Sequence, residues 1–103
     1  MSTKLVYDFE WDIGKALANA TKHGIMFDQA ATVFLDAMAI TVYDVAHSQS
    51  EDRWFTLGRS TSGVLLAVAH TFHETGLAEA RIRIISARAA TPRERRYYEE
   101  EPR

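Results

Sequence analysis

The sequence predicts a single α+β domain over residues 1–103, in which helices pack against an antiparallel sheet in the order β-α-α-β-β-β-β-α. Three observations predict this class. With 103 residues, 47% of them hydrophobic, the chain can bury one hydrophobic core without help from disulfide bonds or a structural metal ion. Helical patterns lie near both ends of the chain. Between them run short apolar segments joined by short polar turns, which is typical of antiparallel strands.

The first third of the chain predicts one strand and two helices. Residues 5–11 alternate apolar and polar side chains, which predicts a strand. Asp12 is placed to cap a helix through about Lys22, which Gly24 would end. The expected inward stripe of this helix is Ile13, Ala16, Leu17 and Ala20. Asp28 is placed to cap a second, short helix ending near Leu35, with Ala30, Val33 and Phe34 facing inward.

The remainder predicts four strands and a last helix. The expected strands are residues 39–44, 53–58, 64–72 and 81–88, with a polar hairpin at 59–63 and a loop around Gly76. Residues 64–69 are continuously apolar, which predicts an inner strand covered on both faces. Thr91 to Glu94 form a capping box with proline at the first helical position, which predicts a helix through about Glu100.

Composition excludes several classes of site. The chain has no cysteine, so a disulfide scaffold, a thiolate zinc site, an iron–sulfur cluster and a cysteine nucleophile are excluded. No two of its four histidines have the i, i+4 spacing of a helical metal site, and we expect no metal and no cofactor. No apolar run approaches 18 residues and no secretory signal is visible, so we expect a cytoplasmic protein without a membrane segment.

Charge is divided unevenly along the chain. Residues 1–52 hold three lysines against eight acids, a net of −5, whereas residues 53–103 hold nine arginines against six acids, a net of +3. Arginine offers a planar fork of donors that matches a phosphate. The alternative is a solvated, salt-bridged face. Two halves of opposite charge also suit a protein with two macromolecular partners of opposite charge.

Two segments in the first half of the chain hold more polar groups than folding requires. Lys22 and His23 end the first helix, where the simpler interpretation is stabilisation of the helix dipole. His47, Glu51 and Arg53 lie in the loop before the third strand. Glu51 and Arg53 leave the same side of an extended segment, so a guanidinium would hold the carboxylate ionised. The simpler alternative is a surface ion pair beside a solvated histidine.

The segment from Arg81 to Arg88 places arginines along an apolar strand. A bulge near Ser86 would bring Arg83 and Arg88 together. Protection of a sheet edge by charge is the competing interpretation. The residue types favour metal-free acid–base chemistry on a phosphodiester, since RNA supplies its own nucleophile, the 2′-hydroxyl. Fixed guanidinium donors would stabilise the phosphate charge of the transition state.

Motifs along nearly the whole chain resemble the BrnT family of type II toxins. The matching residues are Phe9–Asp12, Asn19, residues 22–27, Val33–Phe34, His47–Ser48, Glu51, Arg53, Gly58, residues 83–88, Ala90–Thr91, Glu94, Arg95 and Tyr98. A small departure is Ala37, where members of the family often have proline. The resemblance implies a RelE-like α+β fold, ribonuclease activity without a metal, and a BrnA-type ribbon-helix-helix antitoxin. It also implies a toxin dimer bound to an antitoxin dimer, which represses its operon by contacting operator DNA through the antitoxin.

These residues predict an endoribonuclease toxin. Either Glu51 or His47 would be the general base for the 2′-hydroxyl, and the other, or water, would protonate the leaving oxygen. Arg53, Arg83 and Arg88 would bind the scissile phosphate, with a further hydrogen bond from Ser86. The expected RNA-binding residues are Lys22, His23, Arg81, Tyr97 and Tyr98, with Tyr97 or Tyr98 stacking on a base. The rival functions are a non-catalytic corepressor that retains the toxin fold and an RNA-binding domain.

Overall fold

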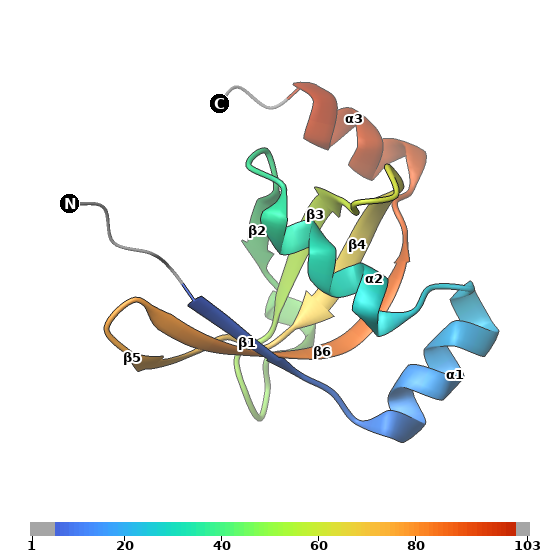
Figure 1. Ribbon diagram of the computed structural model, residues 1–103. Helices are drawn as coiled ribbons and strands as arrows, with labels where there is room; N and C mark the ends of the chain where they lie inside the picture. The colour runs from blue at the N-terminus through green and yellow to red at the C-terminus, as the bar shows by residue number, and fades with distance from the viewer. Residues whose placement is uncertain (1–5, 101–103) are drawn as a thin grey trace.

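The computed structural model describes residues 6–100, and within them the fold is α+β, as the sequence predicts (Figure 1). Its elements, in order, are β1 (Val6–Glu10), α1 (Ile13–His23), α2 (Phe27–Ala31), the 3-10 turn η1 (Thr32–Leu35), β2 (Ile40–Tyr43), the 3-10 turn η2 (Val45–His47), β3 (Trp54–Arg59), β4 (Leu65–His70), β5 (His73–Gly76), β6 (Glu79–Ala89) and α3 (Pro92–Glu100). Leu5, the first residue of the expected N-terminal strand, lies outside the described residues.

The sheet is mixed, whereas the sequence predicts an antiparallel one. Its strand order is β1-β6-β4-β3-β2, and β5 also pairs with β6. The pairs β2–β3, β3–β4, β4–β6 and β5–β6 are antiparallel, but β1 runs parallel to β6. Short turns fix the direction of strands that follow one another. They do not fix the direction of β1, whose partner comes from the other end of the chain.

The strand β5 is absent from the predicted elements. It forms a hairpin with β6 that projects from one side of the molecule (Figure 1). All four of its residues are exposed, so its sequence carries no apolar pattern that would predict a strand. By contrast, every residue of β4 is buried between β3 and β6, which confirms the inner strand expected from residues 64–69.

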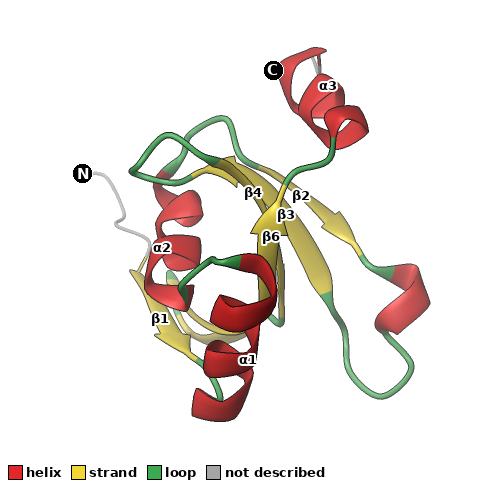
Figure 2. Ribbon diagram, turned by 90° about the vertical axis from the view of Figure 1, so that its right-hand side faces the viewer, coloured by secondary structure: helices red, strands yellow, loops and turns green. Residues whose placement is uncertain are grey.

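The main core lies on the side of the sheet that α1 and α2 cover (Figure 2). It joins Phe27, Ala30 and Val33 to Ile82, Ile84 and neighbouring residues of β4 and β6. The inward stripe expected for α1 is wrong for Ile13 and Leu17, whereas Ala16 packs against the main core and Ala20 is half-buried. Ile13 and Leu17 are 73% and 66% exposed, and the residue that α1 buries is Asn19. A hydrogen-bonded amide, together with the small side chain of Ala16, therefore attaches this helix to the sheet.

The opposite side of the sheet, here called the α3 face, carries a smaller core of Leu57, Leu65, Ala67 and Tyr98. Because α3 follows β6 directly, it packs at one end of this face (Figure 2). The rest of the α3 face holds the polar residues described below.

The helix termini agree with the sequence in three of four cases. The Asp12 carboxylate accepts from the backbone N–H of Lys15, and Gly24 ends α1 with a left-handed φ of 70°. Thr91 and Glu94 exchange both hydrogen bonds of the capping box. Asp28 is not a cap, because α2 begins one residue before it and has Met26 at the N-cap position. Within residues 6–100, no helix is long and apolar enough to cross a membrane.

Candidate functional site

Asn19 fixes the end of α1 against β6. Beyond Arg83, β6 no longer pairs with β1, so the backbone of Ala87 faces the helix instead of a strand. The Asn19 side chain donates to the Ala87 carbonyl at 2.9 Å and accepts from its N–H at 3.0 Å. It also donates to the carbonyl of Ile25 at 3.0 Å. The turn that follows α1 is thereby held beside the end of β6.

Lys22 and His23 lie in the last turn of α1, directly before this turn, and are exposed. Together with Lys15, Ala18, Asn19, Ile85 and Ser86 they line a shallow depression of about 210 Å³. The structure therefore brings two of the expected RNA-binding residues next to Ser86. The helix-dipole interpretation also holds, since both side chains lie in the last turn of α1.

A bulge in β6 places three predicted residues on one face. The register against β4 shifts where Ala69 pairs with Ser86 but His70 pairs with Ile84, so Ile85 is the extra residue. The bulge near Ser86, which the sequence allows but does not establish, is therefore present. Ile82, Ile84 and Ala87 all belong to the main core, although regular alternation would place Ala87 on the opposite face from Ile82 and Ile84. Arg83, Ser86 and Arg88 consequently share the α3 face.

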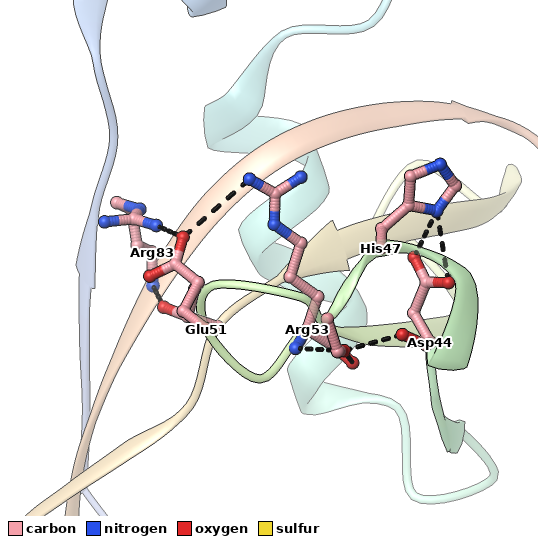
Figure 3. A network of polar contacts seen from close by, with 7 residues as sticks. Asp44, His47, Glu51, Arg53 and Arg83 are labelled. Atoms are coloured by element: carbon pink, nitrogen blue, oxygen red, sulfur yellow. Dashed lines mark hydrogen bonds and ion pairs between the residues drawn. The ribbon is translucent and has the colours of Figure 1, made fainter.

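Glu51 joins the loop before β3 to β6. One of its carboxylate oxygens accepts from the Arg83 guanidinium and lies 3.8 Å from that of Arg53 (Figure 3). Arg53 and Glu51 are two residues apart, and their expected pairing is confirmed. The contact with Arg83 spans 32 residues and creates a cluster of two guanidinium groups around one carboxylate. Side chains of these three residues are 29–41% exposed, so the cluster remains accessible to a ligand.

The loop that carries Glu51 is closed by Ser48 and Asp44. The Ser48 hydroxyl donates to the carbonyl of Asp44 at 2.6 Å and accepts from the N–H of Arg53 at 3.0 Å. The N–H of Asp44 donates to the Arg53 carbonyl at 2.8 Å. These bonds hold the ends of the loop together, so its side chains have defined positions.

His47 contacts Asp44 rather than Glu51. Its Nδ1 lies 3.0 and 3.2 Å from the two carboxylate oxygens of Asp44, and in Figure 3 the Arg53 side chain stands between His47 and Glu51. The side chain of His47 is 65% exposed and that of Asp44 is 9% exposed. A buried carboxylate therefore orients an accessible imidazole, with Nδ1 directed inward. Asp44 is absent from the residues that the sequence predicts for the site, although its i, i+3 spacing from His47 is a local signal for this contact.

Arg88 is bound by the first turn of α3. Its guanidinium donates to both carboxylate oxygens of Glu94, at 2.6 and 3.0 Å. This hydrogen bonding raises the pKa of Arg88 and lowers the pKa of Glu94. Glu94 also accepts from the N–H of Thr91, so a single carboxylate caps the helix and holds the arginine. Arg88 and Arg83 thus share a face but belong to separate ion pairs.

The remaining predicted residues have different environments. Arg81 is exposed and lies 4.0 Å from Glu10 of β1, close to the β5 hairpin. Tyr97 is 44% exposed and faces the sheet from α3. The expectation that Tyr98 could stack on a base is wrong, because this residue is 7% exposed and belongs to the smaller core. Its hydroxyl donates to Asp36 at 2.6 Å.

A family model described as "Ribonuclease toxin, BrnT, of type II toxin-antitoxin system" matches residues 11–94. The chain belongs to the BrnT family. This membership supports ribonuclease activity and implies an RNA substrate and an antitoxin partner. The BrnT match spans the Lys22–His23 turn, the Glu51 cluster and the Arg88–Glu94 pair.

A solved structure supports the fold independently. The 1.1 Å crystal structure of the ribonuclease toxin BrnT of Brucella abortus matches with a TM-score of 0.56 and 23% identity. The match covers 87% of this chain and 99% of that chain. No curated protein matches the sequence. Among residues 6–100, no group of three or more histidine, aspartate or glutamate side chains is placed to hold a metal ion.

Proposed function

We propose that this protein is an endoribonuclease toxin that cleaves RNA by attack of the 2′-hydroxyl on the adjacent phosphate, without a metal ion. The observation that carries the proposal is the cluster of Glu51, Arg53 and Arg83, on the same sheet face as Ser86 and Arg88. Such a reaction requires a base, a proton donor and fixed positive charge around the phosphate. The family description supports a ribonuclease. The arginines would supply the positive charge, and His47 and Glu51 are the candidates for the base and the proton donor.

Arg53 and Arg83 would bind the non-bridging oxygens of the scissile phosphate. Glu51 holds both guanidinium groups at a fixed separation before substrate binds, which removes the cost of organising them during the reaction. Glu51 accepts a hydrogen bond from Arg83 and forms an ion pair with Arg53, so both guanidinium groups have further N–H donors for the phosphate. Arg88, on the same face of β6, would be the third guanidinium to bind the phosphate, and Ser86 would donate an additional hydrogen bond.

His47 is the stronger candidate for the general base. Its Nδ1 hydrogen donates to Asp44, which leaves Nε2 as the acceptor for the 2′-hydroxyl proton. One oxygen of Glu51 is already occupied by two guanidinium groups, so Glu51 acts mainly by positioning them. The leaving 5′-oxygen would take its proton from the resulting imidazolium or from water. Glu51 as base and His47 as acid is the alternative assignment.

Further contacts would bind the RNA and the antitoxin. Lys22 and His23 would contact the RNA backbone beside Ser86, Arg81 would extend the contact along β6, and Tyr97 would stack on a base. The partner would be a BrnA-type ribbon-helix-helix antitoxin, with two toxin and two antitoxin chains in the complex. Contact with operator DNA would be made through the antitoxin, and the complex would act in the cytoplasm.

The proposal is tested by incubating the purified protein with a labelled RNA in the presence of a chelator. We expect cleavage, and we expect Arg83→Ala and His47→Gln to lower its rate by about 10²-fold or more. His73→Gln is the matched control, because His73 is an exposed histidine on β5, outside the cluster. Absence of cleavage by the wild-type protein, or activity that returns only with added magnesium, would contradict the proposal.

A further inference from the structure

A cavity of about 330 Å³ lies between α3 and the α3 face of the sheet. It is lined by Val42, Phe55, Leu57, Arg93, Glu94 and Tyr97. The rings of Phe55 from β3 and Tyr97 from α3 therefore lie at the same opening as the aliphatic side chains of Val42 and Leu57. This combination suits a flat, partly apolar ligand that stacks on aromatic rings.

The wall that α3 contributes is held firmly. The capping box fixes the start of the helix, and the hydroxyl of Tyr98, the residue that follows Tyr97, donates to Asp36. Tyr97 is thereby held over the sheet although 44% of it is exposed. A stacking platform that is already in place costs little conformational entropy when a ligand binds.

The cavity adjoins the candidate catalytic surface. In the sheet register, Phe55 pairs with Ala69, which in turn pairs with Ser86. Phe55 and Ser86 are thus separated by two strand spacings, which is roughly 10 Å. At the other side, Glu94 lines the cavity and binds Arg88 directly. A ligand in the cavity would therefore lie beside the arginines of β6.

The charges at the rim favour a nucleic acid over an apolar peptide. Arg93 lines the cavity and suits a phosphate backbone, and because Arg88 pairs with Glu94, the charge of Arg93 leaves the rim net positive. The carboxylate of Glu94 would not repel that backbone strongly, because Arg88 and the N–H of Thr91 already bind its oxygens. Single-stranded RNA combines stacking bases with the negative charge that this rim would attract.

We infer that the cavity takes one unpaired base of the RNA substrate, adjacent to the scissile phosphate, and that the enzyme therefore requires single-stranded RNA. The inference rests on the proposed function. A base in a duplex is stacked and paired on both sides, so it could not enter between Phe55 and Tyr97 without leaving the helix. The position of cleavage would then depend on which nucleotide fills the cavity.

The first test measures binding without cleavage. The probe is a fluorescein-labelled, single-stranded 2′-O-methyl oligoribonucleotide, whose anisotropy reports its dissociation constant. We expect Tyr97→Ala to weaken binding about tenfold and Tyr97→Phe to bind as the wild type does. Phe72→Ala is the matched control, because Phe72 has a similar exposure of 40% but lines a different cavity. Melting temperatures establish that each variant is folded.

The second test separates this inference from the proposed function. A single abasic nucleotide is placed in turn at each position near the cut. At one position beside the cut it should lower kcat/KM of the wild type, and at that position it should not lower kcat/KM of Tyr97→Ala any further. The inference is overturned if Tyr97→Ala binds and cleaves as the wild type does, or if duplex RNA is cleaved equally well. It is also overturned if Tyr97→Ala loses affinity for the antitoxin but not for the oligonucleotide. A wild-type protein that binds the oligonucleotide through Tyr97 but cleaves no RNA would contradict only the proposed function.

Discussion

Arg88 illustrates how one residue serves both the fold and the candidate site. Its guanidinium holds Glu94 in two hydrogen bonds and also faces the surface that carries Arg83 and Ser86. We expect Arg88→Ala to lower RNA cleavage by about 10²–10³-fold, the usual effect of losing a donor fixed on a transition-state anion. Arg88→Lys should restore little activity, because an ammonium group lacks the planar fork. Initial rates on a labelled RNA measure both effects.

Arg59→Ala is the matched control for that substitution. Arg59 lies 3.9 Å from Glu99 of α3, and its side chain is 41% exposed, against 36% for Arg88. Both substitutions remove an ion pair to the same helix. If the two variants lose activity equally, the loss reflects the docking of α3, and Arg88 has no role at the phosphate.

The pH dependence of the rate distinguishes the roles of His47 and Glu51. If the two groups share the acid–base work, the rate is bell-shaped in pH, and its limbs belong to the pair. His47→Gln should then remove one limb and Glu51→Gln the other. Our preferred assignment predicts instead that Glu51→Gln lowers the rate at every pH, because Glu51 positions Arg53 and Arg83. If Glu51→Gln loses a limb of the pH–rate profile that His47→Gln retains, Glu51 rather than His47 is the general base.

At the level of single residues, local sequence predicted some contacts and not others. The pairing of Glu51 with Arg53 follows from their spacing in an extended segment. The contact of Glu51 with Arg83 depends on where the loop meets β6, which no local pattern specifies. Which of Tyr97 and Tyr98 is accessible to an RNA base depends on the orientation of α3, which exposes Tyr97 and buries Tyr98.

Among the elements, α3 has the most explicit sequence signal and gives a direct test. The Thr91 hydroxyl accepts from the N–H of Glu94 at 3.1 Å, and we expect Thr91→Ala to destabilise the protein by about 1 kcal/mol. For a domain of this size that is a fall of roughly 4–8 °C in Tm. RNA cleavage at low temperature should persist. A variant with an unchanged Tm and no activity would show that Thr91 acts in the reaction instead.

Elements defined by their own sequence were predicted well, and those defined by tertiary contacts were not. The capping signals of α1 and α3 and the apolar run of β4 are local, and the structure contains all three. The parallel pairing of β1 depends on a strand more than half the chain away. The position of α1 depends on Asn19, whose role appears only when the unpaired edge of β6 is known.

At the scale of the whole molecule, His70 links stability to pH. It is 1% exposed, accepts from the Thr56 hydroxyl through Nε2, and donates to the Thr71 carbonyl through Nδ1. Burial lowers the pKa of His70 below its ordinary value of 6.5. As the pH falls below 6.5, the unfolded chain binds a proton that the folded protein resists, so stability decreases. We expect Tm to fall between pH 7.5 and 5.5.

A substitution tests whether His70 causes that decrease. His70→Gln removes the titrating group and should flatten the dependence of Tm on pH, although its Tm at neutral pH will be lower. His73→Gln, which removes an exposed histidine, should retain the wild-type slope. An unchanged slope in His70→Gln would assign the pH dependence to other groups.

The two sides of the sheet have different roles in this account. One side holds the main core under α1 and α2, and the other carries the arginines, the Glu51 cluster and the cavity beside α3. The sequence predicted the α+β class and the residue types of the site, because both depend on local pattern. It left open which arginines share a face, because that depends on the bulge at Ile85, whose presence the sequence did not establish.

The central claim, that the 2′-hydroxyl is the nucleophile, is tested most directly with one modified substrate. Two RNAs of the same sequence are compared, one of them with a single 2′-deoxy nucleotide immediately before the cut. We predict that the unmodified RNA yields a 2′,3′-cyclic phosphate at the new end, with or without a chelator, and that the modified RNA resists cleavage at that position. Efficient cleavage of the 2′-deoxy substrate at the same bond would contradict the mechanism, because the attacking oxygen would then have to come from water.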